Sequence, residues 1–451
     1  MMLYNANEWR AVTLTEVLDA REKRAELQKK LLSDYEATLI SFTMNIAGPI
    51  KNSPAINRAY RYGLTELLKL FPADKILYKH TQSDHCGPFA LLALDINSEH
   101  AKELCVSLEE KNSIGRLFDI DVIDRTGKKL ERRTQRSCIV CGKPGRECAA
   151  GRLHPVEELV DITNKIISDH FCSSDAELLG KSAAESLIRE VETTPKPGLV
   201  DLSNNGSHTD MDVETFRKSA LALEPYFIEC VQIGMHTKKL TAHETFDHLR
   251  ASGLLAEEKM YEATSGINTH KGLIYSMGVL LGAIGRLWSI ETPVSDTSEI
   301  VAEVTELVRE STMLDFQRAC GTTAGERLYK EKGLAGIRGE VASGFSSVIN
   351  ISLPAYISAL YRGLSQNDAG IYALLSLIST IDDTNIYHRG GDSGAKFAKS
   401  YAKKLLENKL DKSLLVKMDE EFIMHRLSPG GSADLLAITY FLHSLRELKF
   451  I

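Results

Sequence analysis

The sequence lacks the features of an exported, membrane-spanning or disulfide-stabilised protein. Charged residues interrupt the first twenty positions, so the apolar core of a signal peptide is missing there. The longest apolar stretch, residues 272–287, is too short and too rich in glycine to span a bilayer. Eight cysteines in 451 residues do not make a disulfide scaffold. We therefore expect a soluble cytoplasmic protein with reduced thiols and no membrane partner.

The sequence also lacks an excess of positive charge. It has 54 lysines and arginines against 61 acidic residues, which gives a formal net charge of −7. Such a charge balance offers no broad neutralisation of phosphates, which argues against a general nucleic-acid binder. Local clusters of basic residues could still hold a small anionic substrate. The length and the apolar content of 43% predict a globular chain of two to three domains.

The first part of the chain, residues 1–172, is predicted to be a mixed α+β domain. Apolar residues at helical or alternating spacing mark its elements. The expected helices span 10–32, 53–70 and 98–111, and the expected strands span 37–46, 75–80 and 88–96. A β-hairpin is predicted from 116–124 and 129–134, joined by the turn RTGK.

The second part, residues 173–451, is predicted to be an all-α domain. Almost every long segment there has helical periodicity, and strand-like runs are scarce. The expected helices span 176–192, 213–236, 241–251, 269–289, 296–313, 368–381, 394–408 and 432–447. We expect the boundary in the polar segment 168–175, interpreted as a short joint between the domains.

The segment GRLFDIDVID carries the strongest local signal of the first domain. In a strand, side chains two positions apart share a face, so Asp119 and Asp121 should project together, with Arg116 just upstream. Two such carboxylates can hold Mg²⁺ against a substrate diphosphate. Alternatively, they form the polar face of a half-buried hairpin. The pattern G-R-x-x-D-x-D resembles nucleotidyltransferases of the DNA polymerase beta type, which favours the metal site.

A cysteine-rich segment, CIVCGKPGREC followed by AAGRLH, offers two interpretations. Three thiols and an imidazole could complete a tetrahedral zinc site. Its ligands would be Cys138, Cys141, Cys148 and His154. Alternatively, the segment is a loop tightened by small residues, with Arg146, Arg152 and His154 contacting phosphate. The ligands are spaced more closely than in common zinc fingers, so the sequence favours the second interpretation.

Nearly all of residues 35–160 resembles a known family, the apo-citrate lyase phosphoribosyl-dephospho-CoA transferases or holo-citrate lyase synthases. The matching stretches are TMNIAGPIKNSPAINRAYRYG, DHCGPFALLALDI, GRLFDIDVI and CIVCGKPGRECAAGRLH. The resemblance implies that a serine of the citrate lyase acyl carrier protein, the gamma chain, attacks the α-phosphate of a triphosphoribosyl-dephospho-CoA and releases diphosphate. Asp119 and Asp121 would then carry Mg²⁺, and Lys51, Arg58 and Arg61 would contact diphosphate or pantetheine.

Five polar, glycine-bearing segments interrupt the helices of the second domain. They span 192–212, 266–272, 333–345, 382–399 and 428–437. Glycine turns that lead into helix N-termini are natural anion sites, and nearby lysine or arginine suits a polyphosphate. The basic residues in question are Lys196, His270, Lys271, Arg338 and Arg389. Alternatively, the glycines end helices and the charges are ordinary surface.

The same segments resemble the triphosphoribosyl-dephospho-CoA synthases, an all-helical family, over roughly residues 178–446. The implied reaction joins ATP to the ribose 2′-hydroxyl of dephospho-CoA and expels adenine. Asp382 and Asp383 would supply Mg²⁺ ligation or the general base, with Glu190 and Asp201 in reserve. The basic residues named above would grip the triphosphate.

Two other interpretations stay open at this point. The chain could join a general nucleotidyltransferase to a helical domain like the ADP-ribosylhydrolases, because DDTN at 382–385 also occurs in that setting. It could also be a scaffold that binds a carrier protein and has inert sites. The intact acidic pairs at 119 and 121 and at 382 and 383 speak against a scaffold. The pathway interpretation, with both transferase steps on one chain, accounts for all the motifs.

Overall fold

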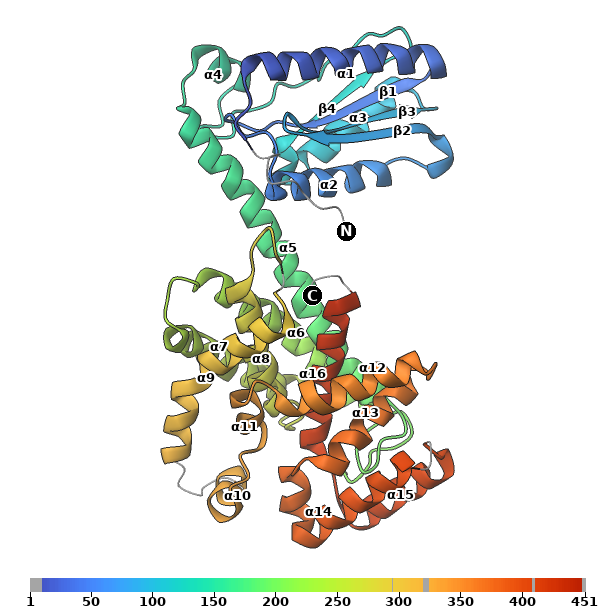
Figure 1. Ribbon diagram of the computed structural model, residues 1–451, viewed down its shortest axis with the longest axis vertical. Helices are drawn as coiled ribbons and strands as arrows, with labels where there is room; N and C mark the ends of the chain where they lie inside the picture. Colours follow the sequence, from blue (N-terminus) through green and yellow to red (C-terminus); the bar gives the residue numbers. More distant parts are fainter. Residues whose placement is uncertain (1–9, 294, 319–323, 408–409, 448–451) are drawn as a thin grey trace. The chain divides into compact units, whose positions relative to one another are not determined.

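The chain folds into two compact units, residues 1–172 and 173–451 (Figure 1). The computed structural model describes residues 10–293, 295–318, 324–407 and 410–447. The first unit contains a four-stranded sheet with helices, and the described part of the second unit contains helices and no strand. The predicted change from a mixed domain to a helical one is therefore confirmed.

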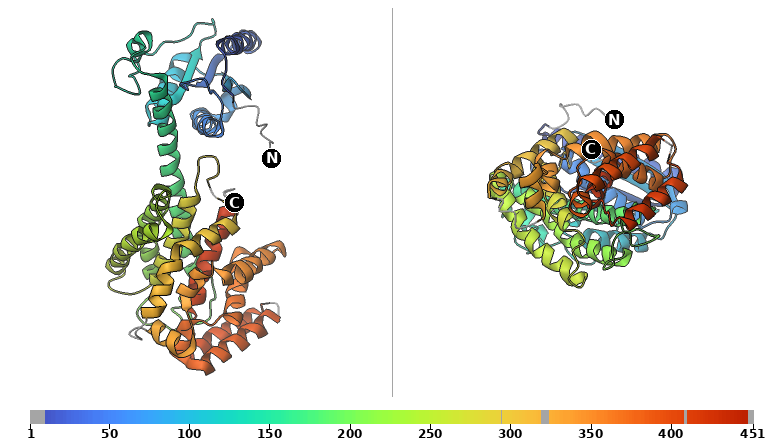
Figure 2. Two further views of the ribbon diagram at one scale, coloured as in Figure 1. Left: turned by 60° about the vertical axis from the view of Figure 1, so that its left-hand side comes forward. Right: turned by 90° about the horizontal axis from the view of Figure 1, so that it is seen from below.

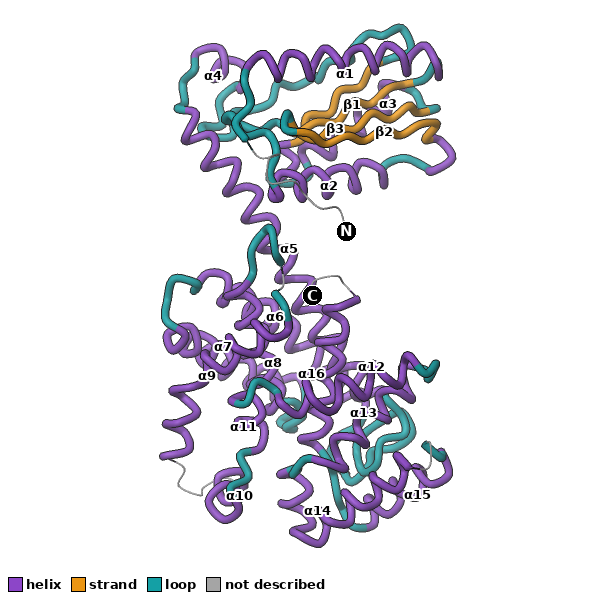
Figure 3. Tube along the Cα trace, in the orientation of Figure 1, coloured by secondary structure: helices purple, strands orange, loops and turns teal. Residues whose placement is uncertain are grey.

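An antiparallel sheet with the strand order β2-β3-β1-β4 forms the centre of the first unit (Figure 3). Its strands are β1 (Thr38–Met44), β2 (Ile76–Asp84), β3 (Gly87–Leu94) and β4 (Phe118–Ile123). The main helices are α1 (Leu14–Tyr35), α2 (Pro54–Lys69) and α3 (Ser98–Glu110). Short 3₁₀ turns at Ala73–Lys75 and Ile114–Leu117 precede β2 and β4.

Helices cover both faces of this sheet (Figure 1). On one face, Leu31 of α1 packs with Leu39 and Leu91 in a buried cluster. On the other face, α2 approaches so closely that a Cβ at Gly63 would lie 2.7 Å from the rings of Phe42 and Phe118. A glycine is therefore required at the point where α2 meets the sheet.

The outer edge of β4 is covered by charged side chains. The Glu109 carboxylate of α3 accepts the N–H of Ile120 at 2.9 Å, and Lys102 donates to the carbonyl of the same residue at 3.2 Å. Arg136 donates to the carbonyl of Phe118 at 2.7 Å. An open strand edge invites pairing with another chain, and these contacts satisfy the backbone groups instead.

The predicted hairpin strand at 129–134 is wrong. After β4 the chain makes a tight turn, in which the Asp124 carboxylate accepts the N–H groups of Thr126 at 2.9 Å and Lys128 at 3.0 Å. The pairing continues only as an isolated antiparallel bridge between Ile123 and Lys129, with bonds from Asp124 N–H to the Lys128 carbonyl and from Leu130 N–H to the Val122 carbonyl, and no strand forms. The charged residues that follow turn toward Glu109, with which Arg132 pairs at 3.1 Å.

The interpretation of 168–175 as a short joint is wrong, because the segment lies inside the 37-residue helix α5 (Val156–Glu192), although the boundary itself falls where it was expected. The boundary between the compact units falls within this helix, between residues 172 and 173. Ile167 and Phe171 are both buried, at the four-residue spacing of one helix face. Asp175 continues that buried face and accepts the indole N–H of Trp288 at 2.7 Å, and the segment contains neither glycine nor proline to end the helix.

The second unit is a bundle of helices, which remain grouped when the molecule is turned (Figure 2). Besides α5 they are α6 (Val213–His236), α7 (Ala242–Ala263), α8 (Lys271–Leu287), α9 (Thr297–Arg318), α10 (Ala324–Lys332), α11 (Gly336–Ala342), α12 (Leu353–Tyr361), α13 (Gln366–Thr380), α14 (Thr384–Glu407), α15 (Lys412–Met424) and α16 (Gly430–Glu447). The sequence analysis missed α10, α11, α12, α15 and the first turns of α14. None of the helices within the described ranges combines the length and apolar content that a bilayer crossing needs.

We predict that Glu109→Gln destabilises the first unit by about 3–5 kcal/mol, because it leaves Arg132 and Arg136 without their buried partner. Urea-dependent pulse proteolysis of the full chain, with mass spectrometry of the fragments, identifies the half that unfolds. Glu103→Gln is the matched control, since Glu103 is exposed and pairs with Arg133 at 3.4 Å; it should cost less than about 1 kcal/mol. Equal costs for the two variants would contradict the structural role of Glu109.

Candidate active sites

The acidic pair of the first unit lies on one face of the sheet. In the antiparallel register, Asp119 stands opposite Thr43 and Asp121 opposite Ser41. Asp119 is exposed and Asp121 is half-buried, whereas Ile120 between them is buried on the other face. The two carboxylates are therefore neighbours on a partly open surface, on the side of the sheet that α1 covers.

Basic groups surround this acidic pair. Lys129, just beyond the turn that follows β4, pairs with Asp121 at 2.6 Å. Arg24 of α1 also lies within electrostatic reach: burial lowers the pKa of its guanidinium, and the charges of Asp119, Asp121 and Asp84 oppose that effect. The face thus combines three carboxylates with two cations. A metal-bound diphosphate needs such a mixture of ligands and counter-charges.

Lys51 lies in the loop that follows β1. Burial, together with the charge of Arg21, lowers the pKa of its ammonium group, which donates to the Ile46 carbonyl at 2.5 Å. A Cβ at Gly87 would lie 3.0 Å from the backbone oxygen of Lys51. This loop therefore packs on the turn between β2 and β3, and that turn needs glycine.

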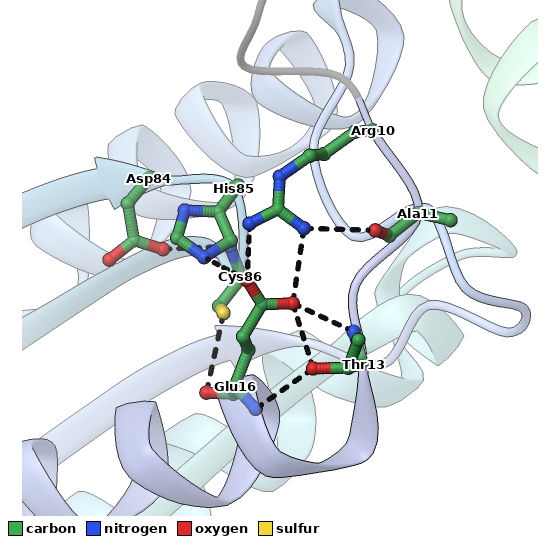
Figure 4. A network of polar contacts seen from close by, with 7 residues as sticks. All are labelled: Arg10, Ala11, Thr13, Glu16, Asp84, His85 and Cys86. Carbon is green, nitrogen blue, oxygen red and sulfur yellow. Dashed lines mark hydrogen bonds and ion pairs between the residues drawn. The ribbon is translucent and has the colours of Figure 1, made fainter.

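A polar network fastens the start of α1 to the same turn (Figure 4). The Glu16 carboxylate accepts hydrogen bonds from Arg10 at 3.1 Å and from the N–H of Thr13 at 2.9 Å. These contacts hold the pKa of Glu16 well below its usual range. His85 lies 3.5 Å from the same carboxylate, and the Cys86 thiol lies 3.5 Å from the Glu16 carbonyl. The network fixes the helix that carries Arg24.

Three further arginines of the predicted site have different surroundings. Arg58 lies over the ring of Phe171 in α5, with 4.1 Å between its guanidinium carbon and the ring centroid. Arg61 is exposed. Arg116 donates to the carbonyl of Ser137, at the base of the cysteine-rich loop. Arg58 and Arg116 thus connect parts of the fold, which is a role that the sequence did not reveal.

The second unit contains a buried ion pair. Lys196, whose side chain is 1% exposed, contacts the Glu190 carboxylate at 2.5 Å and the Glu190 carbonyl at 2.7 Å. Burial, the largest influence, raises the pKa of Glu190, and the charge of Lys196 opposes it. Removing one partner from such a pair typically costs about 3–5 kcal/mol.

Asp434, in the first turn of α16, was missed by the sequence analysis. Burial and the nearby charges of Glu190 and Asp383 raise its pKa well above the usual value. A Cβ at Gly272, in the first turn of α8, would lie 2.2 Å from its carboxylate oxygen. Within the described part of the chain, no hydrogen bond or ion pair occupies this carboxylate. Asp434 is therefore free to act on a ligand.

Asp383 holds two helix starts together. One carboxylate oxygen accepts the N–H and the hydroxyl of Ser432 in α16, at 2.7 and 2.8 Å. The other accepts the N–H of Asn385 in α14 at 2.9 Å. Burial outweighs these bonds and raises the pKa of Asp383. Its contacts resemble a shared N-cap more than a free metal ligand.

Asp201 organises the loop between α5 and α6. Its carboxylate accepts the N–H groups of Lys196 at 2.7 Å and Ser203 at 2.6 Å. Asp419 of α15 supports the same loop by accepting the N–H of Gly198 at 2.8 Å. Asp201 thus acts on the ion pair indirectly, by fixing the backbone that carries Lys196.

His270, just before α8, is buried beside this cluster. Its Nδ1 lies 2.7 Å from the hydroxyl of Ser219, and its Nε2 has no hydrogen-bond partner among the described residues. Burial and then the charge of Lys196 lower its pKa to about 3. The imidazole is therefore neutral at physiological pH.

A separate cavity of about 410 Å³ is lined by two more of the predicted basic residues of the second unit. Lys271 and Arg338 both line it, with Phe246 and Tyr275 on the apolar wall. Lys271 pairs with Glu257 at 2.7 Å. The aromatic wall suits a base and the cations suit phosphates.

Asp382 and Arg389 lie at the start of α14. Asp382 is exposed and pairs with Lys399 at 2.6 Å. Arg389 donates to the carbonyl of Ser207 at 3.2 Å. These contacts tie α14 to its surroundings. The structure therefore brings together Glu190, Lys196, His270 and Asp383 with Asp434, while Asp382 stands outside that buried group.

Comparison with known families decides between the interpretations. Residues 176–450 match the family model of ATP:dephospho-CoA triphosphoribosyl transferase, and residues 12–170 match that of apo-citrate lyase phosphoribosyl-dephospho-CoA transferase. The chain belongs to both families. It is an enzyme with two transferase activities.

Two of the similar proteins align with nearly the whole chain, and a third aligns with part of it. Protein CitXG of Haemophilus influenzae is 35% identical, and the alignment covers 98% of each chain. Protein CitXG of Leuconostoc mesenteroides subsp. cremoris is 31% identical over 96% of this chain and 97% of its own. A 2-(5''-triphosphoribosyl)-3'-dephosphocoenzyme-A synthase of Pectobacterium atrosepticum is 41% identical and covers 59% of this chain and 88% of its own.

We predict that His270 makes the fold sensitive to acid. Its pKa is lowered in the folded state, so the unfolded chain binds the extra proton and stability is lost as the pH falls below 6.5. Between pH 7.5 and 5 the loss should be about 2 kcal/mol.

Unfolding free energies at both pH values test this prediction. Because other buried groups titrate as well, the informative quantity is the difference between variants. His270→Asn should remove the 2 kcal/mol loss, to within about 0.5 kcal/mol, whereas the exposed His248→Asn should keep it. The same pH dependence in both variants would contradict the assignment.

Proposed function

We propose that the second unit joins ATP to dephospho-CoA at the buried cluster around Lys196, and that the first unit transfers the product to a serine of the citrate lyase acyl carrier protein. The observation that carries the proposal is the half-buried Asp434 carboxylate, which has no hydrogen bond or ion pair among the described residues and lies close to Glu190 and Asp383, in a chain that belongs to both families.

The second-unit reaction is a ribosyl transfer. The 2′-hydroxyl oxygen of dephospho-CoA bonds to C1′ of the ATP ribose, and the bond from C1′ to adenine breaks. The hydroxyl proton is lost, and adenine takes up a proton as it leaves. The triphosphate remains on the transferred ribose. The transition state carries positive charge on the sugar, so a nearby carboxylate stabilises it and can also accept the proton.

Asp434 fits the role of this general base. Its raised pKa makes it a stronger base than an ordinary aspartate, and no donor among the described residues engages its oxygens. Asp383 would act through Asp434, since it fixes the start of α16 by way of Ser432. Glu190 would hold Lys196 in the site, and Asp201 would fix the loop. His270 would offer its unpartnered nitrogen as a neutral hydrogen-bonding group.

Basic residues next to the cluster would bind the triphosphate. Lys271 and Arg338 line the neighbouring cavity, and α8, which begins at Lys271, faces Asp434 at its first turn. In the free protein both side chains pair with acidic residues. A bound polyphosphate would replace those acidic residues as their partner. Arg389 would contribute at the start of α14.

Magnesium suits both sites. Two buried carboxylates, Glu190 and Asp383, and the half-buried Asp434 share one lysine, so the second unit's cluster is short of positive charge, and a divalent cation would supply it. Magnesium usually takes one or two protein carboxylates and completes its shell with phosphate oxygens and water. Glu190, with Asp382 and Asp383 on the α14 side, would offer protein ligands to the ion, which leaves Asp434 free to act as the base. In the first unit, Asp119 and Asp121 would hold the ion.

The first-unit reaction is a phosphoryl transfer of the nucleotidyltransferase kind. The serine oxygen of the carrier protein attacks the α-phosphorus of the triphosphoribosyl group, and diphosphate leaves. A phosphodiester remains on the carrier. Arg24 and Lys129 would neutralise the diphosphate, with Lys51, Arg58, Arg61 and Arg116 as the further cations of this unit. Because both units share one chain, the intermediate forms at a high effective concentration near its consumer. The substrates are cytoplasmic metabolites, which favours that location.

We predict that Asp434→Asn lowers adenine release from ATP and dephospho-CoA by at least about 100-fold, the usual effect of losing a general base. The control is Asp210→Asn, an exposed carboxylate that lies 4.0 Å from His208. Circular dichroism and a melting curve confirm that each variant is folded. Near-normal adenine release from a folded Asp434→Asn protein would refute the assigned role.

We predict that Asp119→Asn and Asp121→Asn each stop the labelling of apo-carrier protein but leave adenine release intact. The reason is that the metal-binding carboxylates serve only the second step. Mass spectrometry of the carrier measures the transfer, and chromatography measures adenine. Asp95→Asn, an exposed residue paired with Lys75 at 2.9 Å in the same unit, is the control. A loss of both activities in the Asp119 variant would contradict a division of labour between the units.

A further inference from the structure

We propose that the cysteine-rich loop of the first unit binds one structural Zn²⁺ ion. Its ligands are Cys138, Cys141, Cys148 and His154. One ligand atom from each residue lies within 4.8 Å of all the others. The sequence favoured a phosphate-contacting loop because of the short ligand spacing, but the fold brings the four groups together.

The distances between ligand atoms match a tetrahedral zinc site. With zinc bonds of about 2.3 Å to sulfur and 2.0–2.1 Å to nitrogen, neighbouring ligands in a tetrahedron lie about 3.5–3.8 Å apart. The sulfurs of Cys141 and Cys148 are 3.5 Å apart, and His154 Nε2 is 3.4 Å from the Cys141 sulfur. A disulfide requires a sulfur separation of about 2.05 Å, so these thiols are not bonded to each other. Isolated thiol hydrogen bonds could explain one such pair but not a closed set of four.

The backbone around the first two cysteines is shaped for thiolates. The N–H of Val140 points to the Cys138 sulfur at 3.4 Å, and the backbone of Lys143 hydrogen-bonds the Cys141 sulfur in the same way. Gly142, directly after Cys141, has a φ of +71°, which favours glycine. Hydrogen bonds to both sulfurs stabilise negative charge there. Metal ligation requires that charge, because the thiolate is the ligand.

His154 has the supporting contact that metal-bound histidines usually show. Its Nδ1 lies 3.3 Å from the carboxylate of Glu158, in the first turn of α5. A carboxylate on one ring nitrogen fixes the ring orientation and leaves the other nitrogen free to bind a metal. Nε2 is the nitrogen that faces the Cys141 sulfur.

The loop needs such a cross-link because it has almost no core. Between Ile123 and Ile167, all within the described ranges, the one apolar side chain that is buried is Cys148. The segment contains an isolated bridge between Ser137 and Pro144 and a short helix, α4 (Gly145–Gly151). A metal would supply the folding free energy that the missing core does not. It would join the loop, anchored on β4 by Arg116 and Arg136, to the beginning of α5.

Metal analysis of the full chain tests this proposal. Protein purified from zinc-supplemented culture without chelators should contain about one equivalent of zinc. Cys138→Ser and Cys148→Ser should each lower the content at least about fivefold, because a three-ligand site binds more weakly. Cys172→Ser is the matched control, a half-buried cysteine outside the cluster, and should retain the ion.

A second measurement covers variants that fail to fold. Wild-type protein stripped with chelator and reloaded with Co²⁺ should show the absorption bands of a tetrahedral thiolate site, and trypsin should cut residues 132–155 faster in the stripped form. Three outcomes would each overturn the proposal. The wild-type protein could remain free of zinc after reconstitution, or the Cys138→Ser, Cys148→Ser double variant could keep its full zinc content. The third is a disulfide between Cys141 and Cys148 in the native protein.

Discussion

The cost of burying charge governs the second unit. Burial raises the pKa of Glu190, Asp383 and Asp434, the charges of Glu190 and Asp383 raise that of Asp434 further, and the buried Lys196 opposes the shift only at Glu190. Such an arrangement is stable only when each acid is either held by hydrogen-bond donors or partly protonated. Asp383 has its donors at the starts of α14 and α16, and Glu190 has Lys196. Among the described residues, Asp434 has neither hydrogen-bond donors nor a lysine partner. Its carboxyl group therefore remains the reactive member of the group.

The first unit handles its carboxylates in the opposite way. Asp119 is exposed and Asp121 is half-buried, so the free-energy cost of removing these carboxylates from water is smaller than for the buried acids of the second unit. This difference suits the proposed substrates. A serine on a folded carrier protein can reach only an open surface, whereas ATP and dephospho-CoA are small enough to enter an enclosed site. An enclosed site also keeps water away from a reactive ribosyl carbon.

The sequence predicted those features, such as helix starts and the alternation of strands, that depend only on residues close together in the chain. The Ser53–Pro54 start of α2 and the alternation of β4 follow from spacing alone, and so did the shared face of Asp119 and Asp121. Contacts between distant segments could not be predicted. Asp383 caps α16 through Ser432, 49 residues further along the chain. In the segment SADLLA, Asp434 has the pattern of an ordinary acidic residue in the first turn of a helix. Its special surroundings arise from Glu190 of α5 and Gly272 of α8, which are distant in the sequence. For the same reason, the continuous helix through 168–175 became evident only from the burial of Ile167 and Phe171.

The distribution of thiols connects the expected location of the protein with the proposed zinc site. Three of the described cysteines converge on one loop, where the Cys141 and Cys148 sulfurs are 3.5 Å apart, close enough to oxidise after a small movement. In an oxidising compartment such a pair would form a disulfide, whereas a reducing one keeps both thiols available to a metal. Bound zinc would in turn protect them, because coordinated thiolates are held apart at ligand distance. The reduced state expected from the sequence and the metal inferred from the fold therefore support each other.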